Sequence, residues 1–303
     1  MKWETLGRNR RGWIGMLTTM MLLHGLMESQ AVARAGEDSP ARSESKKSES
    51  IPFVLRDGYL IVVEGRIGPR QHLKLMIDTG STHSVLRPDL AEHQERVQGR
   101  VRTVNLDQVL KQELVEVDDF QLGPIRIPRL PILLHDLGYL GLTAPGIDGI
   151  IGLDVLRSRH FSIDFGRRRI AFGSSLPLQH SARMELDEAC LTVDILMVNK
   201  PVRLVLDTGV QSILLYRDRL GDRLPELRVE QQIQGASMAG SASLDVVTLP
   251  RMQLSGTNLK RRAALLRNSP LSFMPQVDGY LSLTALGAQR FTFDFENSIL
   301  SWE

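Results

Sequence analysis

Apolar residues along the chain recur mostly with the short, partly alternating spacing of β-strands. The stretches 59–67 and 72–77 are apolar and rich in β-branched residues, and a Gly-Pro-Arg turn at 68–70 separates them. The stretches 191–197 and 202–206 repeat this arrangement around a second turn. Short apolar runs joined by Gly and Pro turns are typical of strand pairs. The pattern therefore predicts a protein built mainly from β-hairpins.

Each half of the chain also contains a second hairpin pattern near its end. In the first half, the segments 161–165 and 169–172 flank a short polar turn. In the second half, the segments 291–295 and 299–302 do the same. Strand-forming residues on both sides of a short polar turn predict two further β-hairpins at matching places.

Helical patterning is confined to two short segments, which also lie at matching places in the two halves. They are 155–159 and 285–289, and we expect each to form about one turn of helix. Asp154 and Thr284 precede them and are residue types that favour the N-cap position. The predicted fold class is therefore all-β.

Three sequence blocks occur twice, in the same order and at a nearly constant offset. Residues 75–80 read LMIDTG and residues 204–209 read LVLDTG, 129 positions later. The blocks that begin at Ile147 and Phe161 recur at Val277 and Phe291, in both cases 130 positions later. A repeat this long indicates a duplicated domain, because the repeats of solenoids are about 20 to 50 residues long.

The duplication predicts two lobes, one at 51–175 and one at 183–303, joined by residues 173–183. Residues 36–50 are small, charged and unpatterned, and we expect them to form a disordered linker. Residues 1–35 are expected to be a signal peptide.

The N-terminal segment has the three parts of an export signal. Four basic residues lie within the first eleven positions, and a mostly apolar stretch follows at 13–27. Small residues then alternate at 31–35, which predicts cleavage after Ala35 or, as second choice, after Ala33. The alternative is an uncleaved membrane anchor, although the apolar stretch is shorter than the roughly 20 residues of a spanning helix. We expect an exported protein, either periplasmic or secreted.

Composition excludes several classes of protein. Of 303 residues, 42% are hydrophobic and 24% are charged, which is the composition of a globular chain and not of a disordered one. The 37 basic and 35 acidic residues leave a formal charge of +2, so the chain has no broad basic field and no nucleic-acid partner is expected.

The cysteine and histidine content argues against bound metal. Cys190 is the sole cysteine and lies in an apolar run, so we expect a buried free thiol and no disulfide framework. The seven histidines show no metal-ligand spacing such as HExxH. We therefore expect no metal and no cofactor.

An aspartate at the end of an apolar strand is unusual, and this chain has two of them. Asp78 and Asp207 each follow such a strand and precede Thr-Gly, which favours a tight turn. A buried carboxylate is costly unless it is hydrogen-bonded, so such residues are often functional. If a pseudo-twofold axis relates the halves, the two carboxylates meet and share a proton. One then acts as acid and the other as base on a water molecule, which permits amide hydrolysis.

These motifs resemble those of a known family. Asp78-Thr-Gly-Ser81 and Asp207-Thr-Gly209 are similar to the active-site triplets of aspartic peptidases, and residues 150–156, IIGLDVL, resemble the matching element of retropepsin-like domains, including bacterial ones. The resemblance covers about 52–303. It implies two fused retropepsin-like domains in an all-β, bilobal aspartic-protease fold, in which two pseudo-twofold-related, β-barrel-like lobes flank a cleft. It also implies a monomer.

The resemblance implies a role for each residue of the triplets. Asp78 and Asp207 would be the catalytic dyad of an exported aspartic endopeptidase that cleaves polypeptides bound in an extended conformation. The threonines would hydrogen-bond across the lobe interface, the glycines would allow close approach, and the serine would hydrogen-bond the outer oxygen of Asp78. These supporting residues are Thr79, Gly80, Ser81, Thr208 and Gly209.

The second lobe departs from the family pattern at two positions. Val210 stands where a hydroxyl residue often follows the triplet, and Ser282 stands where lobe one has Gly152. These departures leave open the alternative of a catalytically weak pseudoprotease that acts as a peptide-binding module.

Two further features have to be placed by the structure. Asp148 and Asp278 also repeat and also precede glycine, and we expect them to cap turns and not to be the catalytic pair. A hairpin flap is expected over each lobe, with candidates at 97–102 and 234–241.

Overall fold

The computed structural model describes most of the two predicted lobes and two short pieces of the N-terminal segment. The described residues are 13–15, 20–22, 49–91, 95–105, 108–138, 146–173, 177–187, 190–223, 227–237, 240–259, 263–267 and 277–303.

Lobe one is a single sheet that closes on itself. Along the sheet the strands follow the order β3-β4-β5-β10-β6-β9-β8-β7, and an additional pairing of β4 with β8 bends the sheet toward a barrel. Two short helices, α1 (Pro88–Ala91) and α2 (Leu153–Leu156), complete the lobe. The strands are β3 (Glu49–Arg56), β4 (Leu60–Ile67), β5 (Arg70–Ile77), β6 (Val85–Leu86), β7 (Glu95–Asn105), β8 (Gln108–Leu122), β9 (Ile125–Leu134) and β10 (Gly149–Ile151).

Lobe two repeats this arrangement with shorter hairpins. Its strands follow the order β18-β19-β22-β17-β23-β16-β15-β20-β21, and β14 pairs with β15. The helical segments are α3 (Arg217–Leu220), η3 (Gly221–Arg223) and α4 (Leu283–Leu286). The strands are β14 (Glu185–Leu186), β15 (Leu191–Met197), β16 (Lys200–Leu206), β17 (Ile213–Tyr216), β18 (Val229–Ser237), β19 (Gly240–Thr248), β20 (Met252–Leu254), β21 (Thr257–Leu259), β22 (Ala263–Arg267) and β23 (Gly279–Leu281).

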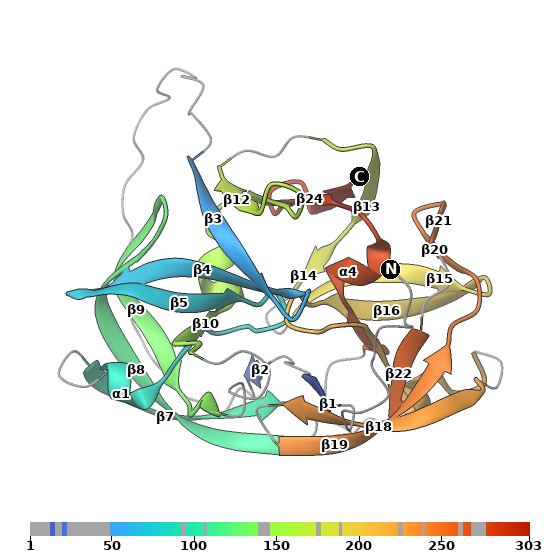
Figure 1. The fold of residues 1–303 in the computed structure, drawn as a ribbon, viewed down its shortest axis with the longest axis horizontal. Coiled ribbons are helices and arrows are strands. Elements are labelled where there is room, and N and C mark those ends of the chain that lie inside the picture. The colour runs from blue at the N-terminus through green and yellow to red at the C-terminus, as the bar shows by residue number, and fades with distance from the viewer. Residues whose placement is uncertain are drawn as a thin grey trace.

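The closing hairpins of the two halves pair with each other and join the lobes. Strand β11 (Phe161–Asp164) pairs with β24 (Arg290–Asp294), and the run β13-β25-β24-β11-β12-β3 crosses from one half of the chain to the other (Figure 1). The other strands are β12 (Arg169–Phe172), β13 (His180–Arg183) and β25 (Ile299–Trp302). At the crossing, the rings of Phe161 and Phe293 stack with centroids 4.5 Å apart. The apolar core therefore continues from lobe to lobe.

The all-β prediction, the four predicted hairpins and the two lobes are confirmed. The predicted helix positions were wrong by about two residues, because α2 and α4 begin at Leu153 and Leu283. The N-cap residues are accordingly Gly152 and Ser282, and not Asp154 and Thr284. The segment expected only to join the lobes also contributes β13, which pairs with β25.

Cys190 is a buried free thiol, as predicted. Burial of the side chain raises the pKa of this thiol to about 12, and the nearby Asp187 charge adds to the effect. A thiol that stays protonated at neutral pH is a packing residue and not a nucleophile.

Two described pieces of the predicted signal peptide form short strands beside the long hairpins. Strand β1 (Trp13–Gly15) pairs in parallel with β18, and β2 (Met20–Leu22) pairs antiparallel with β7 (Figure 1). The predicted cleavage site lies outside the described residues, as does the predicted linker except for Glu49 and Ser50, which begin β3. In the described part of the chain, no helix is long and apolar enough to cross a membrane.

Candidate active site

Asp78 and Asp207 occupy equivalent places in the two lobes. Asp78 follows β5, which pairs in parallel with β10, and its N–H donates to the carbonyl of Ile151 at 3.0 Å. Asp207 follows β16, which pairs in parallel with β23, and its N–H donates to the carbonyl of Leu281 at 3.0 Å. The same pairing in each lobe therefore fixes the backbone at each aspartate.

The two carboxyl groups meet where the lobes touch, and they hydrogen-bond to each other. Within each turn a glycine N–H also donates to its own aspartate, from Gly80 to Asp78 Oδ1 at 2.9 Å and from Gly209 to Asp207 Oδ1 at 2.6 Å. Asp78 is 3% exposed and Asp207 is 0% exposed. The arrangement is a buried pair of carboxyls held by backbone donors.

Burial sets the electrostatics of this pair. It raises the pKa of Asp78 to about 6, although the hydrogen bond from Asp207 and the backbone N–H groups of Gly80 and Ser81 act in the opposite direction. Two carboxyls in contact cannot both ionise easily, so the pair shares a proton and titrates as a unit.

The threonines of the two turns form a reciprocal set of buried hydrogen bonds across the interface. The N–H of Thr79 donates to Thr208 Oγ1 at 3.1 Å, and the N–H of Thr208 donates to Thr79 Oγ1 at 3.2 Å. The same hydroxyls donate to the opposite strand, from Thr79 to the carbonyl of Leu206 at 2.9 Å and from Thr208 to that of Ile77 at 2.8 Å. Four bonds thus fix one turn against the other.

The turns approach each other so closely that Gly80 has no room for a side chain and Gly209 has little. A Cβ at Gly80 would overlap the carboxyl carbon of Asp207. A Cβ at Gly209 would lie 3.0 Å from the carboxyl carbon of Asp78. The second contact is also tight, since 3.0 Å is well inside the 3.5–4.0 Å at which carbon atoms pack best.

The role expected for the Ser81 hydroxyl is wrong. This hydroxyl donates to the carbonyl of His83 at 2.7 Å, so its single proton is not available to the outer oxygen of Asp78. Ser81 instead supports Asp78 through its backbone N–H. The local turn satisfies the hydroxyl within the same loop, which the triplet pattern alone could not indicate.

The two departures in lobe two have structural explanations. Val210 is buried in an apolar cluster together with Tyr216 and Tyr280. Ser282 is the N-cap of α4 and accepts a hydrogen bond from the N–H of Thr284 at 3.3 Å. At Gly152 a Cβ would lie 2.7 Å from the carbonyl carbon of His83, so a side chain is excluded in lobe one and accommodated in lobe two.

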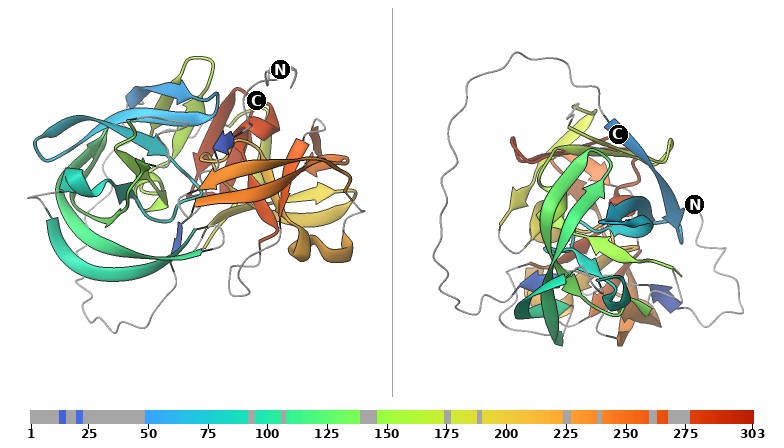
Figure 2. Two further views of the ribbon diagram at one scale, coloured as in Figure 1. Left: turned by 60° about the horizontal axis from the view of Figure 1, so that its bottom comes forward. Right: turned by 90° about the vertical axis from the view of Figure 1, so that its left-hand side faces the viewer.

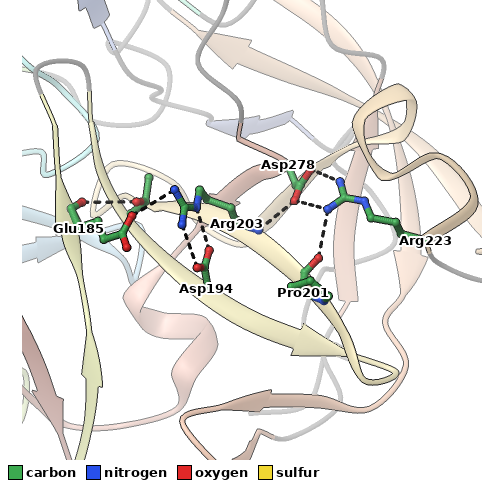
Figure 3. Close-up of polar contacts among 7 residues, drawn as sticks. Glu185, Asp194, Pro201, Arg203, Arg223 and Asp278 are labelled. Atoms are coloured by element: carbon green, nitrogen blue, oxygen red, sulfur yellow. Dashed lines mark hydrogen bonds and ion pairs between the residues drawn. The ribbon is translucent and has the colours of Figure 1, made fainter.

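Asp148 and Asp278 tie strands together at a distance from the dyad, as the capping interpretation expects. Asp148 accepts from the N–H of Lys74 at 2.8 Å. Asp278 accepts from the N–H of Arg203 at 2.9 Å and from the guanidinium of Arg223 (Figure 3). Each carboxylate therefore fixes the strand that ends in the aspartate of its own lobe.

Each lobe contributes one long hairpin, and the two reach toward each other on one side of the molecule (Figures 1 and 2). In lobe one the hairpin is β7–β8, and the candidate flap segment 97–102 lies within β7 and not at the turn. In lobe two it is β18–β19, and the candidate segment 234–241 includes the paired ends of both strands. Val109 of the lobe-one hairpin packs against the apolar cluster of lobe two, so that hairpin crosses the interface.

Sequence reasoning missed two residues near the dyad. Tyr59 is buried in an apolar cluster of lobe one, and burial raises the pKa of its phenol, with smaller effects from the charges of Asp57 and Asp207. Asp154, taken for a helix cap, hydrogen-bonds to Ser84 behind the Asp78 turn. The apolar-apolar-Gly element beside Asp154 could have indicated that this residue lies near the dyad, whereas nothing in the local sequence pattern indicates this for Tyr59.

Comparison with known proteins agrees with this geometry. Residues 63–155 match the family model described as "Aspartyl protease". No curated protein matches the sequence significantly. Among solved structures, the chain is similar to the aspartic proteinase from Irpex lacteus, with a TM-score of 0.55 and 13% sequence identity over 84% of this chain and 97% of that one. Residues 63–155 therefore match an aspartyl protease domain, and the chain has the bilobal fold of an aspartic proteinase.

Proposed function

We propose that the protein is an exported aspartic endopeptidase whose dyad is Asp78 and Asp207. One observation carries the proposal, namely that two buried carboxyls from equivalent turns hydrogen-bond to each other across the lobe interface. Both members belong to one chain, so we propose that a monomer is active.

In the proposed mechanism the pair shares one proton, with Asp207 as the acid and Asp78 as the base. Ionised Asp78 takes a proton from a water molecule, and the resulting hydroxide attacks the peptide carbonyl carbon while Asp207 gives its proton to the carbonyl oxygen. The tetrahedral intermediate then breaks its C–N bond. The proton on Asp78 passes to the leaving amine, and a hydroxyl proton of the intermediate returns to Asp207. The products are a carboxylic acid and an amine, and the enzyme recovers its initial state.

An extended polypeptide is the substrate class that suits strand-rich surroundings, since strand edges bind extended backbone through hydrogen bonds. The two long hairpins, β7–β8 and β18–β19, are the proposed flaps. Export remains a proposal that rests on the sequence of residues 1–35, and N-terminal sequencing of the natural protein tests it. A terminus near Gly36 would support cleavage, and an intact Met1 on a membrane-bound product would indicate an anchor.

The test of the proposed function is hydrolysis of a peptide library by purified protein across pH, with Asp78→Asn and Asp207→Asn as variants. Each should abolish turnover while the fold persists, because acid and base are both required. Asp148→Asn is the matched control and should retain substantial activity, since its carboxylate bonds to the backbone of Lys74.

Two outcomes would contradict the proposal. Normal activity in Asp207→Asn would contradict the single-chain dyad. Peptide binding without hydrolysis by the unmodified protein would indicate a peptide-binding module instead of an enzyme.

A further inference from the structure

Asp154 is a partly buried aspartate directly behind the turn that carries Asp78. Both of its carboxyl oxygens are used within the protein. Oδ2 accepts from the N–H of Ser84 at 2.8 Å, and Oδ1 accepts from Ser84 Oγ at 2.8 Å and from the N–H of Val155 at 2.9 Å. The hydroxyl of Ser84 in turn accepts from the N–H of Gly152 at 3.1 Å. The carboxylate of Asp154 thus connects α2 to the segment 78–84 by hydrogen bonds.

The hydrogen bonds of Asp154 to Ser84 are continued by backbone bonds that reach the turn carrying Asp78. The N–H of Leu153 donates to the carbonyl of Ser81 at 2.8 Å, and the N–H of Asp154 donates to that of Thr82 at 3.2 Å. The N–H of Ser81 donates back to the carbonyl of Asp78 at 3.3 Å. A movement of Ser84 would therefore be transmitted along the segment to Asp78.

Lobe two holds the equivalent loop without a charge. Ile213 stands where lobe one has Ser84, and Thr284 stands where it has Asp154. The hydroxyl of Thr284 donates to the carbonyl of Gln211 at 3.1 Å. At these positions, only the Asp78 loop is held by an ionisable group.

Protonation of Asp154 weakens this set of bonds. A proton on Oδ1 would compete with the hydrogens of Ser84 Oγ and of the Val155 N–H, which both already bond to this oxygen. A proton on Oδ2 has a free site, but the neutral carboxyl is a weaker acceptor for the N–H of Ser84 than a carboxylate is. In either case the carboxyl holds Ser84 less strongly, because hydrogen bonds to a charged group are stronger than bonds to a neutral one.

We propose that Asp154 is a positioning residue for Asp78, and that its ionised form holds the loop 78–84 in the geometry that the dyad requires. This inference rests on the proposed peptidase function. It assigns Asp154 a role in the reaction without contact with the substrate.

The titration of Asp154 falls in an accessible range. Burial raises the pKa of Asp154 to about 6, against the opposing effects of the bonds from Ser84 and Val155 and of the Arg157 charge. Arg157 lies at the C-cap of α2. Besides Asp78, the loop 78–84 contains the titratable His83, which therefore needs its own variant.

The test compares three variants with the unmodified protein. Asp154→Asn keeps the size and the acceptor for the N–H of Ser84, but its amide group can only donate toward Ser84 Oγ, so it imitates the protonated state at every pH. Asp119→Asn is the matched control, because it removes one charge from an exposed ion pair with Arg66 on lobe one. His83→Gln removes the histidine of the loop 78–84.

Two readouts are used. The first is kcat/KM against pH. The second is the backbone amide resonances of Ser84 and Gly80 against pH, which report the position of the loop and do not require turnover.

We expect Asp154→Asn to lose on the order of tenfold in kcat/KM at pH 7, the effect of about one hydrogen bond in the transition state. The slope of its acid limb should fall from about 2 to about 1, because only the dyad still titrates. In Asp154→Asn, the step near pH 6 in the Ser84 amide resonance should disappear and the Gly80 amide resonance should shift. Asp119→Asn and His83→Gln should keep the Ser84 step and an unshifted Gly80 resonance.

The proposal is overturned if Asp154→Asn keeps the Ser84 step and an unshifted Gly80 amide, or if His83→Gln is the variant that removes the step. Absence of hydrolysis by every protein, including the unmodified one, would defeat the proposed function. The two amide resonances would still decide whether Asp154 holds the loop.

Discussion

The bond network between the two threonines makes a specific prediction for Thr208→Val. Valine has nearly the same shape as threonine but neither donates nor accepts a hydrogen bond. The substitution removes the acceptor for the N–H of Thr79 and the donor to the carbonyl of Ile77. Both groups are buried at the lobe interface, where water cannot replace the lost partner.

The expected cost follows from counting the groups left without partners. A buried polar group without a hydrogen bond costs about 1–3 kcal/mol, so the two together should lower the free energy of unfolding by about 2–6 kcal/mol. For a chain of this size, 1 kcal/mol corresponds to about 2–4 °C in Tm. The midpoint should therefore fall on the order of 10 °C. Thr79→Val should cost about the same, because it removes the mirror-image pair of bonds.

The assay is denaturant unfolding together with peptide hydrolysis, and Thr208→Ser is the matched control. Serine keeps the hydroxyl and loses only a methyl group, so it should cost about 1 kcal/mol. Thr208→Val should also lose peptidase activity, since the turns that carry the dyad are no longer fixed to each other. If Thr208→Val is as stable as Thr208→Ser, the interlobe hydrogen bonds do not stabilise the fold and the reasoning fails.

Three further predictions concern the turns and the dyad. Gly80→Ala should abolish hydrolysis and Gly209→Ala should reduce it less, because only a Cβ at Gly80 overlaps the opposite carboxyl carbon. Equal kcat/KM values for the two variants would contradict this. Ser282→Gly should cost a few tenths of a kcal/mol, as usual for an N-cap serine, whereas Gly152→Ser should destabilise lobe one severely in urea unfolding because its Cβ meets the carbonyl carbon of His83. Burial raises the pKa of Asp78 to about 6, so lowering the pH through 6 adds a second proton to the dyad. The value of kcat/KM should therefore fall on the acid side of its pH profile near pH 6. An acid limb near pH 4 would show that burial does not govern the pair.

Much of the fold and the centre of the site could be predicted from the sequence. The repeated Asp-Thr-Gly blocks follow apolar strands at a constant offset, and this register is sufficient to place Asp78 and Asp207 at equivalent turns. The hairpins that begin at Phe161 and Phe291 were also predicted, because alternation and turn residues are local properties.

The remaining features depend on partners distant in the chain. The pairing of β11 with β24 joins two hairpins 130 residues apart, and a local pattern does not specify which strand edges meet. The hydroxyl of Ser81 was misassigned because a nearby carbonyl competes for its proton. Asp154 and Ser84 are 70 residues apart, and only the folded chain brings them together.

The pairing of β11 with β24 joins halves that are encoded separately within one gene. In a dimer of identical chains, every substitution alters both catalytic turns at once, because symmetry repeats it. In this protein a substitution alters one turn and leaves the other unchanged, so Asp78 and Asp207 can acquire different surroundings independently. The pairs Gly152–Asp154 and Ser282–Thr284 already differ in this way. An inhibitor with twofold symmetry would meet two unequal halves, and inhibitors with two different ends are the better starting point for selective binding.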